Sequence, residues 1–155
     1  MRGFAGFLAA LVMQGCSMSS EPSTDYSHSN GLYLKLPATL SVHRRSDGFV
    51  VSRTASLQSR APEQVFVALH QSASAPIGEW LKTKNIAGRV FRYRLERNEG
   101  GSAGESHILI AWCSYADGYV QMTQVSQAEW PTAPNHTLAW IVMAGIGDPQ
   151  SRETK

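Results

Sequence analysis

Apolar residues recur at every second position along much of the chain, which is the pattern of half-buried β-strands. Leu32, Leu34 and Leu36 show this alternation before Pro37 ends the run. Stretches rich in β-branched and aromatic residues predict further strands at 39–44, 49–54, 64–70, 89–95, 107–114 and 119–125. Because these strands follow one another with few helices between them, we expect mostly antiparallel pairing.

Two Asp-Gly pairs divide this pattern at places where the chain must reverse. Ser46-Asp47-Gly48 predicts a turn between the strands at 39–44 and 49–54. Tyr115-Ala116-Asp117-Gly118 predicts a tight hairpin between the strands that flank it. Asp-Gly favours such turns because both residues tolerate positive φ angles.

Two segments depart from the period of two and predict helices. Asn135–Ala144 predicts a C-terminal helix with Leu138, Ile141 and Val142 on one face, and a further strand is the competing interpretation. Pro76–Lys84 predicts a short helix, since proline favours the first helical position. The sequence therefore predicts an α+β fold: a mostly antiparallel sheet of about six or seven strands with one or two packed helices.

The N-terminal residues predict an export signal. Met1-Arg2-Gly3 is a short basic start, and the run from Phe4 to Met13 is apolar without interruption. A bilayer span needs about 20 apolar residues, so the run is too short to cross a membrane. A basic start, a short apolar run and a small residue at Gly15 indicate a secretory signal peptide.

The segment from Leu11 to Cys16 resembles the lipobox of bacterial lipoproteins. That resemblance implies cleavage before Cys16 and acylation of its new N-terminus, and Ser17 after it implies sorting to the outer membrane. A plain secreted protein is the alternative, because Met13 and Gln14 stand where lipoboxes usually carry Leu and a small residue. Several acyl chains anchor a protein stably, since each buried methylene contributes about 0.8 kcal/mol.

The length and composition of the remaining chain predict a single domain that follows a polar spacer. Removal of residues 1–15 leaves 140 of 155 residues, which suits a single domain. Polar sequence without periodicity follows Cys16, so we expect a lipidated cysteine and flexible tether over residues 16–30. The globular domain is expected at 31–147, with a polar tail at 148–155.

Composition narrows the chemistry further. The net charge of +2 gives no reason to expect nucleic acid as a partner. With Cys16 acylated, Cys113 stands alone in an apolar stretch and is expected to be a buried small hydrophobe. None of the five histidines lies two to five residues from another His or Cys, so the sequence indicates no metal site.

Catalytic motifs are absent from the sequence. It contains no Gly-x-Ser-x-Gly elbow, no His-Glu-x-x-His pair and no Walker Gly-Lys-Ser. Paired carboxylates could hydrolyse a glycoside, but a chain with 12 acidic residues offers such pairs by chance. We therefore expect no enzyme activity and no cofactor.

A glycine-rich segment is the first candidate for binding. It comprises Glu99, Gly100, Gly101, Ser102 and Glu105 within an expected loop. Glycines let a backbone lie close against another surface, so the segment can serve as a recognition loop. A plain hairpin tip is the alternative.

A polar row on the following strand is the second candidate. Tyr119, Gln121 and Thr123 share one face by the period of two, and Gln127 and Glu129 follow them. Interfaces favour Tyr because it offers a large contact area at low entropic cost. A solvated sheet face is the alternative.

Taken together, these segments resemble the periplasmic immunity lipoproteins that are paired with toxins of type VI secretion. The resemblance is carried by the lipobox and spacer and by Leu36-Pro37, Glu99–Glu105, Gln121, Gln124, Gln127 and Glu129. It points to the members that neutralise a muramidase, an enzyme that cuts the glycan of the cell wall.

This resemblance implies a non-catalytic inhibitor that inserts loops into the substrate groove of a secreted cell-wall-degrading effector. Its place would be the periplasmic face of the outer membrane, held there by the lipid on Cys16. Two alternatives stay open on the residues alone. One is a structural or assembly lipoprotein of an envelope complex, and the other is a hydrolase.

Overall fold

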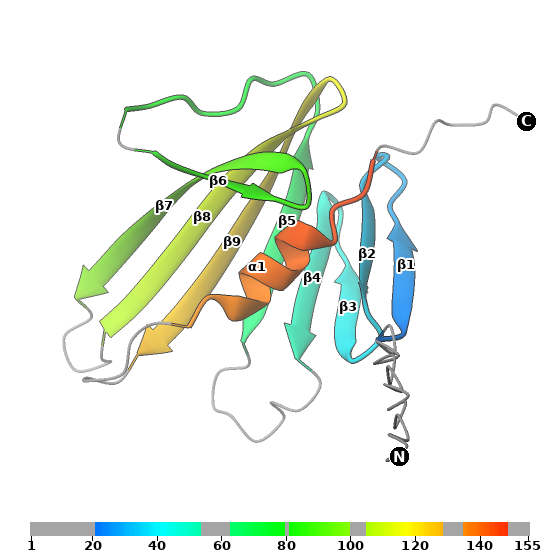
Figure 1. The fold of residues 1–155 in the computed structure, drawn as a ribbon, viewed down its shortest axis with the longest axis horizontal. Coiled ribbons are helices and arrows are strands. Elements are labelled where there is room, and N and C mark those ends of the chain that lie inside the picture. Colours follow the sequence, from blue (N-terminus) through cyan, green and yellow to red (C-terminus); the bar gives the residue numbers. More distant parts are fainter. Residues whose placement is uncertain (1–20, 54–62, 80, 100–104, 129–134, 149–155) are drawn as a thin grey trace, which may run out of the picture.

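The computed structural model describes residues 21–53, 63–79, 81–99, 105–128 and 135–148 (Figure 1). The elements in these ranges are β1 (Ser23–Ser27), β2 (Tyr33–Pro37), β3 (Leu40–Arg44), β4 (Gly48–Arg53), β5 (Gln64–His70), β6 (Lys82–Ile86), β7 (Arg89–Glu99), β8 (Glu105–Tyr115), β9 (Gly118–Ala128) and α1 (Thr137–Ala144). Seven strands form one sheet in the order β3-β4-β5-β9-β8-β7-β6, and β1 and β2 form a separate two-stranded sheet. Neighbouring strands are antiparallel throughout, so the predicted α+β fold is confirmed.

The hairpin between β8 and β9 forms where the Asp-Gly pair predicts it. Tyr115 pairs with Gly118, which leaves Ala116 and Asp117 in the turn. The positive φ angle of 49° belongs to Ala116, not to Gly118. Glycine is needed at 118 for a different reason, because a Cβ there would overlap the carbonyl oxygen of His70 on β5.

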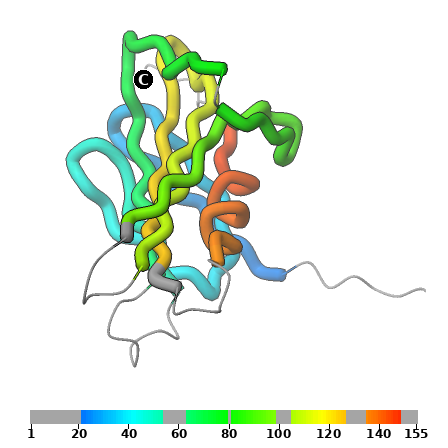
Figure 2. Tube along the Cα trace, turned by 90° about the vertical axis from the view of Figure 1, so that its left-hand side faces the viewer, coloured from blue at the N-terminus to red at the C-terminus, as the bar shows by residue number. Residues whose placement is uncertain are grey.

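The core lies between the large sheet and a layer made of α1 and the β1–β2 hairpin. In Figure 2 the helix lies against one side of the sheet. The core-facing side chains alternate along each strand, and each large apolar one contributes roughly 1.5–3 kcal/mol by leaving water. The cluster is formed by Leu32, Leu34 and Leu36 of the hairpin layer, Leu138 and Val142 of α1, and Phe49, Val51, Val65, Val67, Leu109, Val120 and Met122 of the sheet.

Hydrogen bonds fix this outer layer to the sheet. The hydroxyl of Tyr115 donates to the carbonyl of Gly31 and accepts from the backbone N–H of Tyr33, both at 3.1 Å. Lys35 donates its N–H to the carbonyl of Gly145 at 2.7 Å, so the end of α1 lies directly against β2. The Tyr115 bonds thus fix the β1–β2 hairpin to the sheet, and the Lys35 bond fixes the end of α1 to the hairpin.

The predicted tether over residues 16–30 is wrong for Ser23–Ser27, which form β1. This strand pairs with β2 along its whole length, from Ser23 opposite Pro37 to Ser27 opposite Tyr33. Tyr26 also packs edge-on against Phe49, with ring centroids 6.4 Å apart. Backbone pairing and one aromatic contact stabilise β1, although its sequence lacks an alternating apolar pattern.

The predicted helix at Pro76–Lys84 is also wrong. Residues 73–78 have no regular secondary structure, and Lys82–Ile86 form the edge strand β6, paired with β7. Lys84 places its ammonium over the ring of Trp140, 4.6 Å from the centroid. The strand is therefore stabilised by pairing and by a cation–π contact, which residue type alone did not indicate.

Cys113 is buried, as the sequence predicts. Among the described residues it is a free thiol, and burial raises its pKa to about 11. A thiol with a raised pKa is a poor nucleophile, so Cys113 acts as a packing residue.

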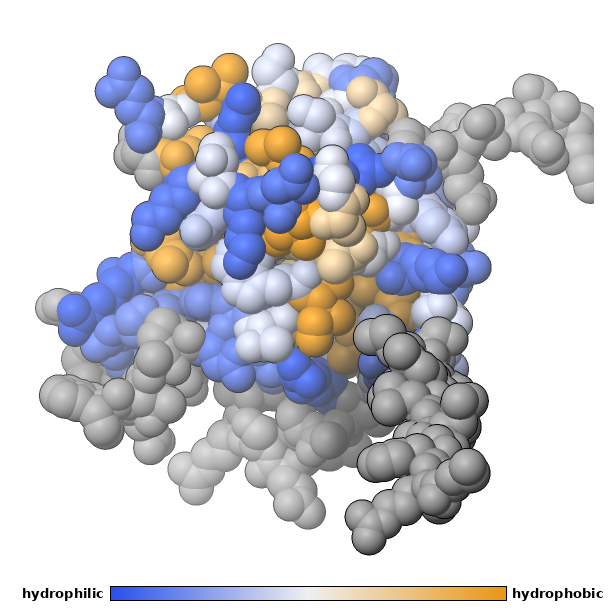
Figure 3. All heavy atoms as spheres, in the orientation of Figure 1, coloured by the Kyte–Doolittle hydropathy of each residue, from blue (hydrophilic) through white to orange (hydrophobic). Residues whose placement is uncertain are grey.

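Apolar and hydrophilic residues are interspersed over the described part of the face that carries α1 (Figure 3). No helix within the described ranges is long and apolar enough to cross a membrane.

Candidate functional site

Polar residues gather at one end of the large sheet, which we call the polar end. In an antiparallel sheet the last residues of one strand meet the first residues of the next at the same edge. Figure 1 shows this edge at the bottom of the sheet. The described residues that lie there are Arg53, Glu63, Glu99, Glu105, Ala128 and Asn135. In sequence they flank residues 54–62, 100–104 and 129–134.

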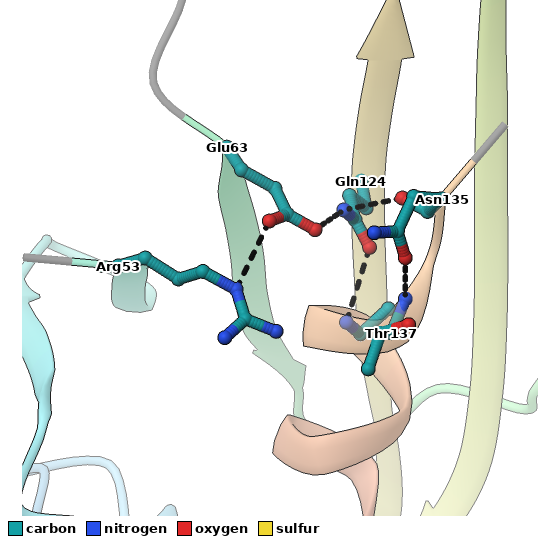
Figure 4. A network of polar contacts seen from close by, with 6 residues as sticks. Arg53, Glu63, Gln124, Asn135 and Thr137 are labelled. Carbon is teal, nitrogen blue, oxygen red and sulfur yellow. Dashed lines mark hydrogen bonds and ion pairs between the residues drawn. The ribbon is translucent and has the colours of Figure 1, made fainter. Parts of the chain in front are cut away.

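The centre of the polar end is Gln124 of β9, whose side chain is 0% exposed (Figure 4). Its carboxamide nitrogen donates to Glu63 Oε1 at 2.8 Å and to the carbonyl of Asn135 at 3.3 Å. Its carboxamide oxygen accepts from the N–H of Ala139 at 3.0 Å. One buried side chain therefore connects β9, the start of β5 and the start of α1.

Gln124 caps α1 from the sheet. The first backbone N–H groups of a helix lack partners within the helix. His136 at the N-cap makes no side-chain capping bond. Instead, Asn135 Oδ1 accepts from the N–H of Thr137 at 2.9 Å, and Gln124 accepts from Ala139.

Glu63 extends this network to β4. Its second carboxylate oxygen accepts from Arg53 Nε at 3.1 Å, and Figure 4 shows the chain of contacts from Arg53 to Thr137. Arg53 and Glu63 are the described residues on either side of 54–62. The network therefore fixes both ends of that stretch relative to α1.

A second network holds the end of the β7–β8 hairpin. Arg97 donates to both carboxylate oxygens of Glu105, through Nε at 2.6 Å and Nη2 at 2.8 Å. His107 Nε2 lies 2.6 Å from Glu105 Oε1. Two parallel hydrogen bonds fix the geometry of an Arg–carboxylate pair more firmly than one does. Glu105 therefore positions the end of the β7–β8 hairpin in this conformation.

The predicted glycine-rich segment is described only at its two ends. Glu99 and Glu105 form the last pair of the β7–β8 ladder, so the structure brings these two residues together. Gly100, Gly101 and Ser102 lie outside the described residues.

The predicted polar row is only partly gathered at this end. Tyr119, Gln121 and Thr123 lie on the sheet face opposite α1; Gln121 accepts from Trp112 Nε1 at 3.3 Å. Gln127 pairs along the backbone with Ser106 near the polar end, while Glu129 lies outside the described residues. Tyr119 lies beside the turn at the far end of β9, where it stacks on His70 at 4.6 Å. At a rise of 3.4 Å per residue this is about 30 Å from the polar end.

Sequence reasoning missed the residues that organise the polar end. Gln124 has the same parity as Val120 and Met122, which both face the core. A polar residue at a core-facing position needs buried partners, and this signal could have identified it. Its partners, Glu63 and Asn135, carry no comparable signal in the sequence.

His136 is affected by the charges of one residue from each network. Its side chain is buried beside Asn135, and burial lowers the pKa of its imidazole, with His107 lowering it further and Glu63 opposing. No group of three or more His, Cys, Asp or Glu that could hold a metal occurs within the described residues. The arrangement as described suits the positioning of surface segments for binding.

The chain as a whole resembles known proteins in sequence and in fold. Residues 33–147 match the type six secretion immunity 3 domain. The chain is 28% identical over 145 residues to the Immune protein Tsi3 of Pseudomonas aeruginosa PAO1, covering 92% of this chain and 96% of that protein. A crystal structure from Bacteroides thetaiotaomicron VPI-5482 aligns with a TM-score of 0.59 at 7% identity, over 81% of this chain and 47% of that one. The chain spans about half of that structure, and this likeness supports the fold alone.

The Gln124 network predicts a stability effect. Gln124→Met keeps the side-chain volume but removes the bonds of Gln124 to the N–H of Ala139 and to Glu63 Oε1. We expect the free energy of unfolding to fall by about 2–4 kcal/mol in urea denaturation.

Gln64→Met is the matched control, because Gln64 neighbours Glu63 but is only half-buried on β5. It should change the free energy of unfolding by no more than about 0.5 kcal/mol. Equal losses in both variants would contradict the assigned role of Gln124.

Proposed function

The chain belongs to the type six secretion immunity 3 family, and on that premise we propose that it blocks the substrate groove of a secreted muramidase toxin with the polar end of its sheet. A type VI secretion immunity protein binds a secreted effector and protects the cell that makes it. Our proposal adds two statements to the family assignment: the toxin is a muramidase, and the polar end is the surface that contacts it.

The observation that carries this proposal is the convergence of strand and helix ends at the polar end. Two polar networks hold Arg53, Glu63, Glu105 and Asn135 there, and Glu99 pairs along the backbone with Glu105. A rigid base reduces the entropy lost when the adjoining segments bind a partner. Stable inhibitor interfaces bury about 1,600 Å² in total, which one loop-bearing end of a domain can supply together with the neighbouring sheet face.

The glycine-rich segment suits entry into a groove. Gly100 and Gly101 carry no side chains that would limit how closely the backbone approaches the groove walls. Glu99 and Ser102 offer acceptors that can replace the hydroxyl and carbonyl groups of a glycan. The resemblance of Glu99–Glu105 to muramidase-neutralising lipoproteins supports a cell-wall glycan cleaver as the toxin.

We further propose that acylated Cys16 tethers the domain to the periplasmic face of the outer membrane. Glu21 lies beside Thr39, with its carboxylate 3.4 Å from the Thr39 hydroxyl, and Leu40 pairs with Arg53 at the polar end. The five residues 16–20 span at most about 17 Å. The tether would then hold the toxin-binding end close to the membrane.

Calorimetry with the proposed muramidase toxin tests the contact surface. Replacing Glu99, Ser102 and Glu105 together by Ala should raise the Kd at least about 100-fold, because direct acceptors and the Arg97 clamp are lost together. Tyr119→Ala, about 30 Å away, should change the Kd less than about threefold.

Circular dichroism of both variants checks that the sheet is intact. A larger loss of affinity in Tyr119→Ala than in the triple variant would move the toxin contact to the other end of β9. The polar end would then lose its assigned role.

Protection of cells tests function and anchoring together. We expect a strain without the gene to lyse on contact with siblings that deliver the toxin, and the wild-type gene to restore survival. Cys16→Ser should restore survival only in part, since the inhibitor would no longer be held at the outer membrane.

Survival of the deletion strain would contradict the immunity assignment to this toxin. Full protection by Cys16→Ser, with the protein absent from the outer-membrane fraction, would contradict only the lipid tether.

A further inference from the structure

The imidazole of His136 is buried, and the described part of the chain offers it no hydrogen-bond partner. The residue is 8% exposed, and neither Nδ1 nor Nε2 has a partner among the described residues. Buried side-chain polar atoms in folded proteins nearly always have at least one partner. An unpaired imidazole at the centre of a binding end therefore calls for a functional explanation.

Its position couples it to both polar networks. His136 is the N-cap of α1, next to Asn135 of the Gln124 network. His107 of β8 and Glu63 before β5 are the titratable groups whose charges act on it. His107 is paired with Glu105 of the second network, and Glu63 is paired with Arg53.

Protonation of His136 would place a charge where the surroundings oppose it. The N-terminus of α1 carries the positive end of the helix dipole, about half an elementary charge. Glu63 is the opposing negative group, and its carboxylate already accepts from Gln124 and Arg53. The neutral imidazole fits this site, and the imidazolium does not.

We propose that His136 is an acid-sensitive latch of the polar end: its protonation releases the start of α1 from Gln124 and loosens the base of the toxin-binding segments. The effect on toxin binding rests on the proposed function. The opening of α1 does not, and it can be measured on the protein alone.

The direction of the pH effect follows from linkage. Burial lowers the pKa of folded His136 below its ordinary value of 6.5, so an opened form takes up the proton first as the pH falls. The open population should then rise up to about tenfold per pH unit below about 6.5, for one proton. At pH 7.5 both forms are neutral, and the latch is closed.

One backbone amide reports on the latch directly. The N–H of Ala139 on α1 is bonded to the side chain of Gln124 on β9. This bond breaks when the start of α1 leaves the sheet. The hydrogen-exchange protection of this amide, corrected for the intrinsic pH dependence of exchange, measures the open population.

The experiment compares the mature chain with His136→Phe and with His43→Gln between pH 7.5 and 5. Phe keeps a planar ring but cannot be protonated, and His43 is an exposed histidine on β3. We expect protection of Ala139 to fall by up to about tenfold per pH unit below 6.5 in the wild type and in His43→Gln. Protection in His136→Phe should stay constant over the same range.

A pH-independent wild type, or an equal fall in His136→Phe, would overturn the latch. If His136→Phe does not fold, an NMR titration of the wild-type His136 ring decides the question. The latch requires the ring to stay neutral below pH 6.5 until α1 loses protection. A ring that titrates at 6.5 while α1 stays protected would refute it. Absence of toxin binding at every pH would instead contradict the proposed function.

Discussion

The buried carboxamide of Gln124 is the interaction on which the arrangement of the polar end depends. It supplies the missing cap of α1, accepts from Ala139 and donates to Glu63 and to the carbonyl of Asn135. Apolar contacts hold α1 on the sheet, but they are not directional and tolerate small shifts. A set of buried hydrogen bonds does not tolerate such shifts, because each unsatisfied polar group costs about 1–3 kcal/mol. Gln124 therefore fixes where the helix begins.

This constraint separates the residues that position the site from those available for contact. Glu105 is bound on both oxygens by Arg97, and Glu63 is bound by Gln124 and Arg53. These carboxylates stabilise the base of the polar end in the described conformation. Under this account, the residues that adjoin these carboxylates in sequence are the ones available to contact a partner. A rigid base with short adjoining segments is the arrangement that lets an inhibitor enter a groove at low entropic cost.

The sequence pattern predicted the fold where side chains alternate. Gln64–His70 is β5 as expected, and the hairpin at Asp117-Gly118 forms, although glycine serves there for close approach rather than for positive φ. β1 and β6 could not be predicted, because pairing with β2 and β7 stabilises them more than their own residues do. The shared face of Tyr119 and Thr123 follows from the period of two. Their distance from the polar end, like the burial of His136, depends on three-dimensional packing alone.

The most direct test of the account is hydrogen exchange of the purified protein with and without its toxin. If the polar end fills the groove, amides near Arg53, Glu63, Glu99 and Glu105 gain protection on binding. The turn at Ala116 and Asp117, at the opposite end of β8 and β9, should exchange at an unchanged rate. Protection confined to that turn, with no change at the polar end, would contradict the account.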